Sequence, residues 1–152
     1  MKTIRAYADT SVFGGCFDEG FEEASQRFFD EVAQSRFRLV VSATTAQELR
    51  EAPEHVRAVL DVVPTEQLEY HEISEEMVEL RDAYLDAGVL GEGSDADALH
   101  VAAATVLNCD IVVSWNFKHI VHFEKIRGFN AVNQMKGYKP IAIYSPLELI
   151  QP

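Results

Sequence analysis

The stretch Ser94–Asn116, which reads SDADALHVAAATVLNCDIVVSWN, decides the fold. Its first part predicts a helix from Ser94 to about Leu107, because Ser94 suits an N-cap and small or apolar residues occupy most sides. Such a helix is expected to be buried and packed closely on a sheet. Asp110–Ser114 then follows as a continuous apolar strand of the kind that parallel sheets bury on both faces. The stretch therefore predicts an α/β domain.

The flanking sequence repeats this alternation of helix and strand. Strands are predicted at Ile4–Ala8, Arg36–Ser42 and Pro140–Tyr144, and helices at 21–34, from Thr44 or Thr45, at 53–62 and at 74–87, with a last helical turn at Ser145-Pro146. Residues 68–73 are extended in a state that the pattern leaves open, Gly14 and Gly15 indicate a turn or loop, and 116–139 look irregular. We expect a single domain over residues 1–152, with a central, mostly parallel sheet flanked by helices.

The composition of the chain argues against a membrane protein and against a secreted one. No apolar run approaches the roughly 20 residues that a membrane span needs, so no membrane association is expected. Arg5 and Asp9 interrupt the first apolar segment, which argues against a secretory signal. Cys16 and Cys109 show no paired spacing. We therefore expect a cytoplasmic protein with reduced thiols.

The net charge of −12 opposes a nucleic-acid partner, because proteins that grip phosphates usually carry a basic surface. The basic residues are nevertheless concentrated. Between residues 117 and 139 there are five of them and a single acid: Lys118, Lys125, Arg127, Lys136 and Lys139 against Glu124. This segment is either a local phosphate-binding surface or a solvated loop with ordinary charge scatter.

Oxygen-bearing side chains follow the predicted strands. Asp9 comes directly after the first strand, Glu48 lies about a turn into the helix after the second, and Asp97 is in the first turn of the buried helix. Ser114 and Asn116 follow the third strand. Because ligands bind beyond the carboxyl ends of parallel strands, these side chains are expected to meet. Each also has a local explanation, since all of them suit turns or helix caps.

Carboxylates that are brought close together repel one another, and a low-dielectric cleft increases this repulsion. A cation usually neutralises such a cluster, and oxygen ligands favour Mg²⁺ or Mn²⁺ over zinc. An ion of this kind binds phosphate oxygens, activates a water and stabilises a leaving oxygen. The cluster therefore suits phosphodiester hydrolysis, with Asp9, Glu48 and Asp97 as metal ligands and catalytic residues.

Four motifs together resemble the PIN domain, the nuclease fold of VapC-type toxins. They are AYADTSVF around Asp9, TAQELRE around Glu48, SDADALHVAAA around Asp97 and NCDIVVSWNFKHI, which contains Asn116. They occur in the family's order, and the resemblance covers nearly the whole chain. The resemblance implies a metal-dependent endoribonuclease of the toxin type that acts on RNA. It further implies a cognate antitoxin that blocks the site, and a homodimer.

The sequence departs from the family once, because the family's fourth acid falls on Asn116. An asparagine still offers a carbonyl oxygen but no charge, so Asn116 is expected to assist the catalytic carboxylates. Asp95 points to a different face of the helix from Asp97 and is the weaker candidate. Substrate contacts are predicted for Lys118, His119, Thr10 and Ser114, while His100 and Trp115 are interpreted as core residues.

Two other classes of function stay open at this point. The missing fourth acid and the net acidity favour a PIN-like module that binds RNA or a protein without cutting. A receiver or an aspartyl phosphatase would also place an acid after the first strand. Both fit poorly. A receiver also needs paired acids ahead of this one and a lysine after a late strand, and the phosphatase needs a second aspartate at the position of Ser11.

Overall fold

Five parallel strands form one sheet in the order β3-β2-β1-β4-β5 in the structure, a computed structural model that describes residues 2–150. The strands are β1 (Ile4–Ala8), β2 (Phe37–Ser42), β3 (Leu68–His71), β4 (Ile111–Val113) and β5 (Ala142–Tyr144). The helices are α1 (Thr10–Gly15), α2 (Glu22–Ala33), α3 (Ala43–Arg50), α4 (Glu54–Asp61), α5 (Glu75–Asp86), α6 (Asp95–Val106) and α7 (Phe123–Met135). Short 3₁₀ turns occupy Thr65–Gln67 and Pro146–Leu149. The predicted α/β class and single domain are confirmed.

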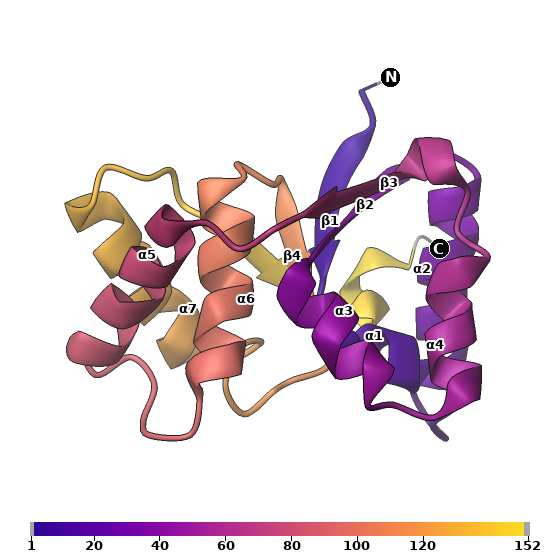
Figure 1. Ribbon diagram of the computed structural model, residues 1–152, viewed down its shortest axis with the longest axis horizontal. Helices are drawn as coiled ribbons and strands as arrows, with labels where there is room; N and C mark the ends of the chain where they lie inside the picture. The colour runs from indigo at the N-terminus through magenta and orange to yellow at the C-terminus, as the bar shows by residue number, and fades with distance from the viewer. Residues whose placement is uncertain (1, 151–152) are drawn as a thin grey trace.

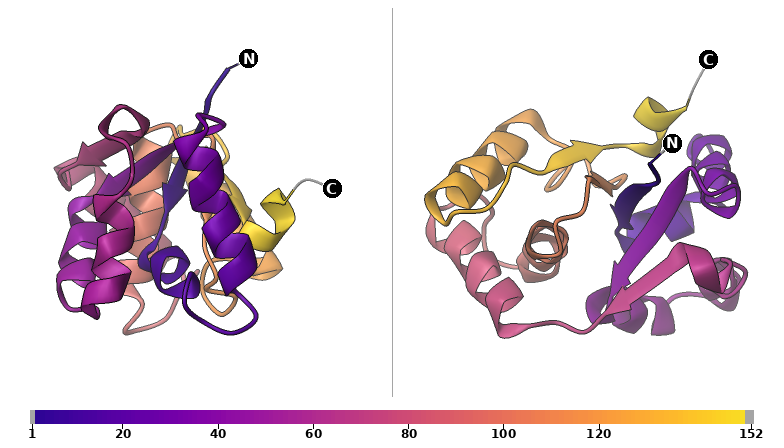
Figure 2. Two further views of the ribbon diagram at one scale, coloured as in Figure 1. Left: turned by 90° about the vertical axis from the view of Figure 1, so that its right-hand side faces the viewer. Right: turned by 90° about the horizontal axis from the view of Figure 1, so that it is seen from above.

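The sheet separates two layers of helices (Figures 1 and 2). Helices α5, α6 and α7 cover one face, and α1 to α4 lie on the other. Side chains alternate along β1, so that Tyr7 enters the core under α5 to α7 while Ala6 and Ala8 enter the opposite core. All three are fully buried. The sheet is therefore buried on both faces, as the continuous apolar strands predicted.

The elements around the deciding stretch form as predicted. Helix α6 is buried along its alanine-rich side, and Ala98, Ala102 and Ala103 are completely inaccessible to solvent. Ser74 caps α5, because its hydroxyl accepts a hydrogen bond from the Met77 backbone N–H at 3.2 Å. Small side chains on α6 allow the close approach to the sheet that brings its first turn next to the strand ends.

Two segments expected to be irregular are helical. Phe123–Met135 forms α7, and its pattern was obscured by Gly128, a residue that disfavours helices. A Cβ at Gly128 would lie 2.9 Å from a methyl group of Val89, so close packing requires the glycine. Thr10–Gly15 forms α1, where two glycines likewise hid a short helix. The undecided segment is a strand, β3, over Leu68–His71.

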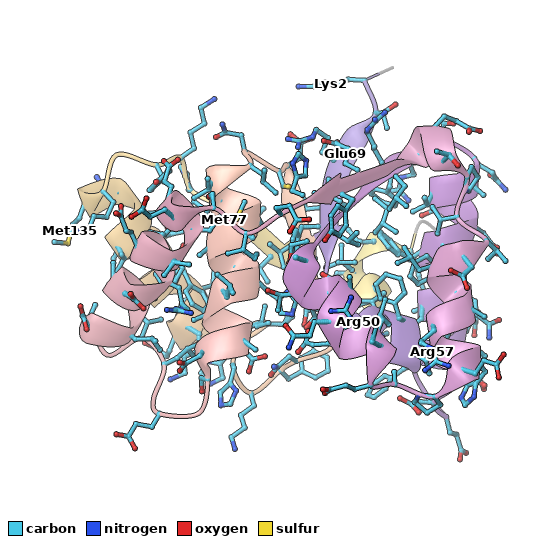
Figure 3. All side chains as sticks on the ribbon, in the orientation of Figure 1. Lys2, Arg50, Arg57, Glu69, Met77 and Met135 are labelled. Atoms are coloured by element: carbon cyan, nitrogen blue, oxygen red, sulfur yellow. The ribbon has the colours of Figure 1, made fainter. Side chains whose placement is uncertain are left out.

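Glu69 on β3 joins three strands through ion pairs, and Figure 3 marks its position. Its carboxylate accepts hydrogen bonds from Arg5 at 2.8 and 3.1 Å and from Arg38 at 3.0 Å. The hydrogen bonds from Arg5 are the largest cause of a pKa that falls to about 2 for Glu69. The cluster ties the edge strand β3 to β1 and β2.

Stability should depend on pH through this cluster. The folded-state pKa of Glu69 is depressed, so its stabilising contribution is present above about pH 4.5 and is lost as the pH falls towards 2. After solvent screening we expect an effect on the order of 1 kcal/mol. Urea unfolding of the wild type and of Glu69→Gln should differ at pH 7 and converge near pH 2 to 3. A difference that does not change with pH would contradict this assignment.

Candidate functional site

The carboxyl ends of β1 and β4 lie side by side, and Asp9 and Ser114 follow them directly. The Asp9 backbone N–H donates to the Val113 carbonyl at 3.2 Å. Ser11 Oγ donates to Asp9 Oδ1 at 2.6 Å, and Ser114 Oγ donates to Oδ2 at 2.7 Å. Asp9 is only 4% exposed. Hydroxyl groups therefore orient both oxygens of a buried carboxylate.

Burial dominates the electrostatics of Asp9. It raises the pKa of Asp9 above the ordinary value, and this rise is only partly offset by the charge of His100 and by the hydroxyls of Ser11 and Ser114. The charge of Asp97 adds to the rise. Asp9 and Asp97 thus lie within electrostatic reach of each other, although they come from β1 and α6.

The two serine hydroxyls also bind the backbone that follows β4. Ser11 Oγ accepts from the Trp115 N–H at 2.9 Å, and Ser114 Oγ accepts from the Asn116 N–H at 2.9 Å. Ser114 therefore satisfies a local backbone group and contacts Asp9 at the same time. A direct contact of Ser114 with substrate stays a prediction.

Glu48 extends from α3 towards α1 and α6. Its Oε1 accepts from Thr10 Oγ1 at 2.7 Å and is 2.6 Å from Nε2 of His100. The spacing of Thr45 and Glu48 also fits a capping box, in which Glu48 would bind back to a cap at Thr45. The structure shows that this local explanation of Glu48 is wrong. The N-cap of α3 is Ser42, and Thr45 itself completes the box. Thr10, which was predicted to contact substrate, is held by Glu48.

His100 is buried in the core, as the sequence interpretation expected, and it also binds the site carboxylate of Glu48, which that interpretation missed. Its side chain is 2% exposed, and its Nδ1 is 2.7 Å from the Tyr7 hydroxyl. Burial alone would lower the pKa of His100, but Tyr7, Glu48 and Asp9 outweigh burial and raise it. Burial would likewise raise the pKa of Glu48, but the bond and charge of His100 lower it. The pair is therefore ionic at neutral pH.

Asp97 pairs with a second histidine. Its Oδ2 is 2.8 Å from Nδ1 of His119, and both side chains are about a quarter exposed. The side-chain oxygen Oδ1 of Asn116 accepts a hydrogen bond from the His119 backbone N–H at 2.9 Å. Asn116 thus serves the turn that presents His119, which is its structural explanation, and a catalytic role for it stays a prediction.

The basic residues divide between two places. Lys118 is exposed in the loop between Asn116 and His119, next in sequence to the histidine that binds Asp97. Lys125 and Arg127 belong to α7, and the Arg127 guanidinium lies over the ring of Phe123. Only the first part of the basic segment therefore adjoins the candidate site.

Asp9, Glu48 and Asp97 were predicted to bind Mg²⁺ or Mn²⁺. Within residues 2–150, no group of three or more His, Cys, Asp or Glu side chains is arranged to hold a metal ion. A three-carboxylate centre is not preformed, because Glu48 and Asp97 are each engaged by a histidine. Mg²⁺, however, usually binds through one or two carboxylates together with waters and phosphate oxygens. A site of this kind at Asp9 and Asp97, which lie within electrostatic reach of each other, stays a prediction.

Comparisons with known proteins place the fold. No protein-family model and no curated protein matches the sequence. A chain in the crystal structure of VapBC2 from Rickettsia felis, bound to a DNA fragment from its promoter, aligns with a TM-score of 0.59. The alignment has 12% identity and covers 93% of this chain and 98% of that one.

A second solved structure is similar over a part of its length. Tyrosyl-tRNA synthetase from Aeropyrum pernix aligns with a TM-score of 0.51 and 12% identity, over 93% of this chain and 52% of that chain. At such identities the likeness concerns the fold alone. Together with the all-parallel sheet and its two helical layers, the alignment shows that this chain shares the fold of that VapBC2 chain.

Proposed function

We propose that this protein is a metal-dependent endoribonuclease of the VapC-like toxin type, which hydrolyses RNA phosphodiester bonds. The observation that supports the proposal is that Asp9, directly after β1, lies within electrostatic reach of Asp97 from α6 and of His100, which binds Glu48 from α3. This arrangement sits in a fold like that of a chain in the VapBC2 structure. Carboxylates gathered at a strand edge are the ligands that hard cations prefer.

Asp9 and Asp97 would hold the Mg²⁺ or Mn²⁺ ion. When bound, such an ion lowers the pKa of a coordinated water and stabilises charge on phosphate oxygens. Ser11 and Ser114 keep the Asp9 carboxylate in one orientation. Glu48 is ionised and anchored through Oε1, so its second oxygen is positioned to accept a hydrogen bond from the attacking water. Lys118 and His119 flank the site and can meet substrate phosphates.

The proposal extends to partners. A cognate antitoxin that covers the site, an RNA substrate and a homodimer are all part of it, as the family resemblance implies. A cytoplasmic location also stays a prediction. Among residues 2–150, no helix is long and apolar enough to cross a bilayer.

Metal removal provides the first test. Purified protein and structured RNA should give cleavage with Mg²⁺ or Mn²⁺, no cleavage after treatment with EDTA, and full recovery when Mn²⁺ is added back. The physical reason is that Asp9 and Asp97 repel each other and place no positive charge on the phosphate by themselves. Cleavage that continues unchanged in EDTA would refute a metal-dependent mechanism.

A specific observation favours a second candidate, a PIN-like module that binds without cutting. Each carboxylate already has protein partners: Asp9 binds two hydroxyls, and Glu48 and Asp97 each bind a histidine. Calorimetric titration with Mn²⁺ separates the two candidates. An enzyme should bind the ion at millimolar concentration or below, whereas a module that has lost its metal site should release no heat.

A further inference from the structure

A chain of buried hydrogen bonds runs through the core to Glu48. The Tyr7 hydroxyl is 2.8 Å from Ser42 Oγ and 2.7 Å from His100 Nδ1, and His100 Nε2 is 2.6 Å from Glu48 Oε1. Ser42, Tyr7 and His100 are each no more than 2% exposed. The chain connects β2, β1, α6 and α3; of these, α3 carries Glu48, α6 carries Asp97, and Asp9 directly follows β1.

The two carboxylate oxygens of Glu48 differ in their hydrogen bonds. Oε1 receives both Thr10 Oγ1 and His100 Nε2, while none of the residues between 2 and 150 donates a hydrogen bond to Oε2. The side chain is 38% exposed, so the second oxygen has access to solvent. Two fixed donors on one oxygen leave the carboxylate a single favoured orientation, with its other oxygen directed away from the core.

We propose that His100 is a positioning residue, which is locked by Tyr7 and Ser42 and in turn holds Glu48 with its free oxygen towards the reacting phosphate. The inference deepens the proposed function and rests on it. It assigns a role to a histidine that would otherwise be costly to bury, since a buried polar ring stabilises the fold only when its nitrogens are bonded. It also explains why Tyr7 stands among apolar residues on a central strand.

Changes in the rate of RNA cleavage test whether this chain of hydrogen bonds positions Glu48. His100→Leu should lower kcat about 10- to 100-fold with little change in KM, because residues that orient a reacting group act mainly on the chemical step. His100→Gln keeps an amide donor and should recover part of the loss. Tyr7→Phe removes only a hydroxyl that does not touch Glu48, and should lower kcat by about 3- to 10-fold.

The chain offers a matched control in Tyr84. Its hydroxyl is also buried and hydrogen-bonded, to Asn133 and Thr105, but it lies in the core between α5, α6 and α7. Tyr84→Phe should affect stability about as much as Tyr7→Phe and should leave kcat unchanged. Equal losses of kcat in both variants would mean that Tyr7 acts only through stability, which overturns the proposal.

The deciding measurement is a double-mutant cycle in which His100→Leu and Tyr7→Phe are each combined with Glu48→Gln. If His100 acts through Glu48, neither change lowers kcat further once Glu48 is replaced. A loss of the same size in both backgrounds overturns the proposal. Tyr7→Phe keeps the aromatic ring in the core, so it provides the result even where His100→Leu does not fold.

A second double-mutant cycle needs neither metal nor RNA. It compares the urea unfolding of the wild type, the single variants His100→Gln and Glu48→Gln, and their combination. Contact between the two side chains should make their effects on the free energy of unfolding non-additive. If the wild type cleaves no RNA, the proposed function fails, and the unfolding cycle alone then decides the positioning: coupling supports it, and additivity overturns it.

Discussion

Asp9→Asn is expected to cleave RNA at least about a hundredfold more slowly than the wild type, while unfolding at the same or a higher urea concentration. The loss of rate follows because an amide removes the negative charge that attracts the cation at the strand edge. The stability follows from burial. The ionised form of Asp9 is disfavoured in the folded protein, as its raised pKa shows, whereas a neutral asparagine carries no such penalty.

The sign of the pH dependence follows from the same shift. A carboxyl whose folded-state pKa lies above its unfolded value binds its proton more tightly in the folded protein. The wild type should therefore lose stability relative to Asp9→Asn as the pH rises from the unfolded pKa through the raised folded one. Urea unfolding of both proteins between pH 3 and 8 measures this difference directly.

Asp97 and Asp95 supply the paired control for the loss of rate. Both lie in the first turn of α6, but Asp95 is exposed, whereas Asp97 interacts with His119 and with the charge of Asp9. Asp97→Asn should match the loss seen with Asp9→Asn, and Asp95→Asn should retain wild-type rates. A variant of Asp9 that cleaves normally, or a loss in Asp95→Asn as large as in Asp97→Asn, would show that the site lies elsewhere.

The elements that could be predicted from the sequence are those whose side chains are mostly buried. Helix α6 carries small or apolar side chains on most sides, and β4 is wholly apolar. Their burial could therefore be predicted from the sequence without knowing which elements pack against them. Helix α7 could not be predicted from the sequence. Its interior Gly128 lowers helix propensity, and the reason for that glycine is a contact with Val89, far away in the sequence.

The same distinction applies to the site. Asp9, Glu48 and Asp97 could be proposed because each follows or precedes a strand at a fixed place, and strand ends of a parallel sheet share one edge. His100 could not be assigned, because its partners Tyr7 and Glu48 are 93 and 52 residues away along the chain. A signal was nevertheless present: a histidine three residues after Asp97, on the same side of an otherwise apolar helix.

Gly15→Ala is expected to lower the free energy of unfolding by about 1–3 kcal/mol, the usual range for overpacking a filled core. A Cβ at Gly15 would lie 2.6 Å from both Ser25 Oγ and Trp115 Nε1, atoms that hydrogen-bond to each other at 2.7 Å. Trp115 is 8% exposed and stacks on Phe21 with 4.3 Å between ring centroids, so it has little room to move aside.

The neighbouring Gly14 isolates the cause, because a Cβ there would meet no atom within 4 Å. Gly14→Ala should be neutral or slightly stabilising through helix propensity alone. The displacement caused by Gly15→Ala should also reach the site, since the Trp115 backbone N–H binds Ser11, which in turn orients Asp9. Urea unfolding and cleavage rates of the two alanine variants measure both effects. If Gly14→Ala lost as much stability as Gly15→Ala, helix α1 rather than the contact with Trp115 would be the origin of the loss.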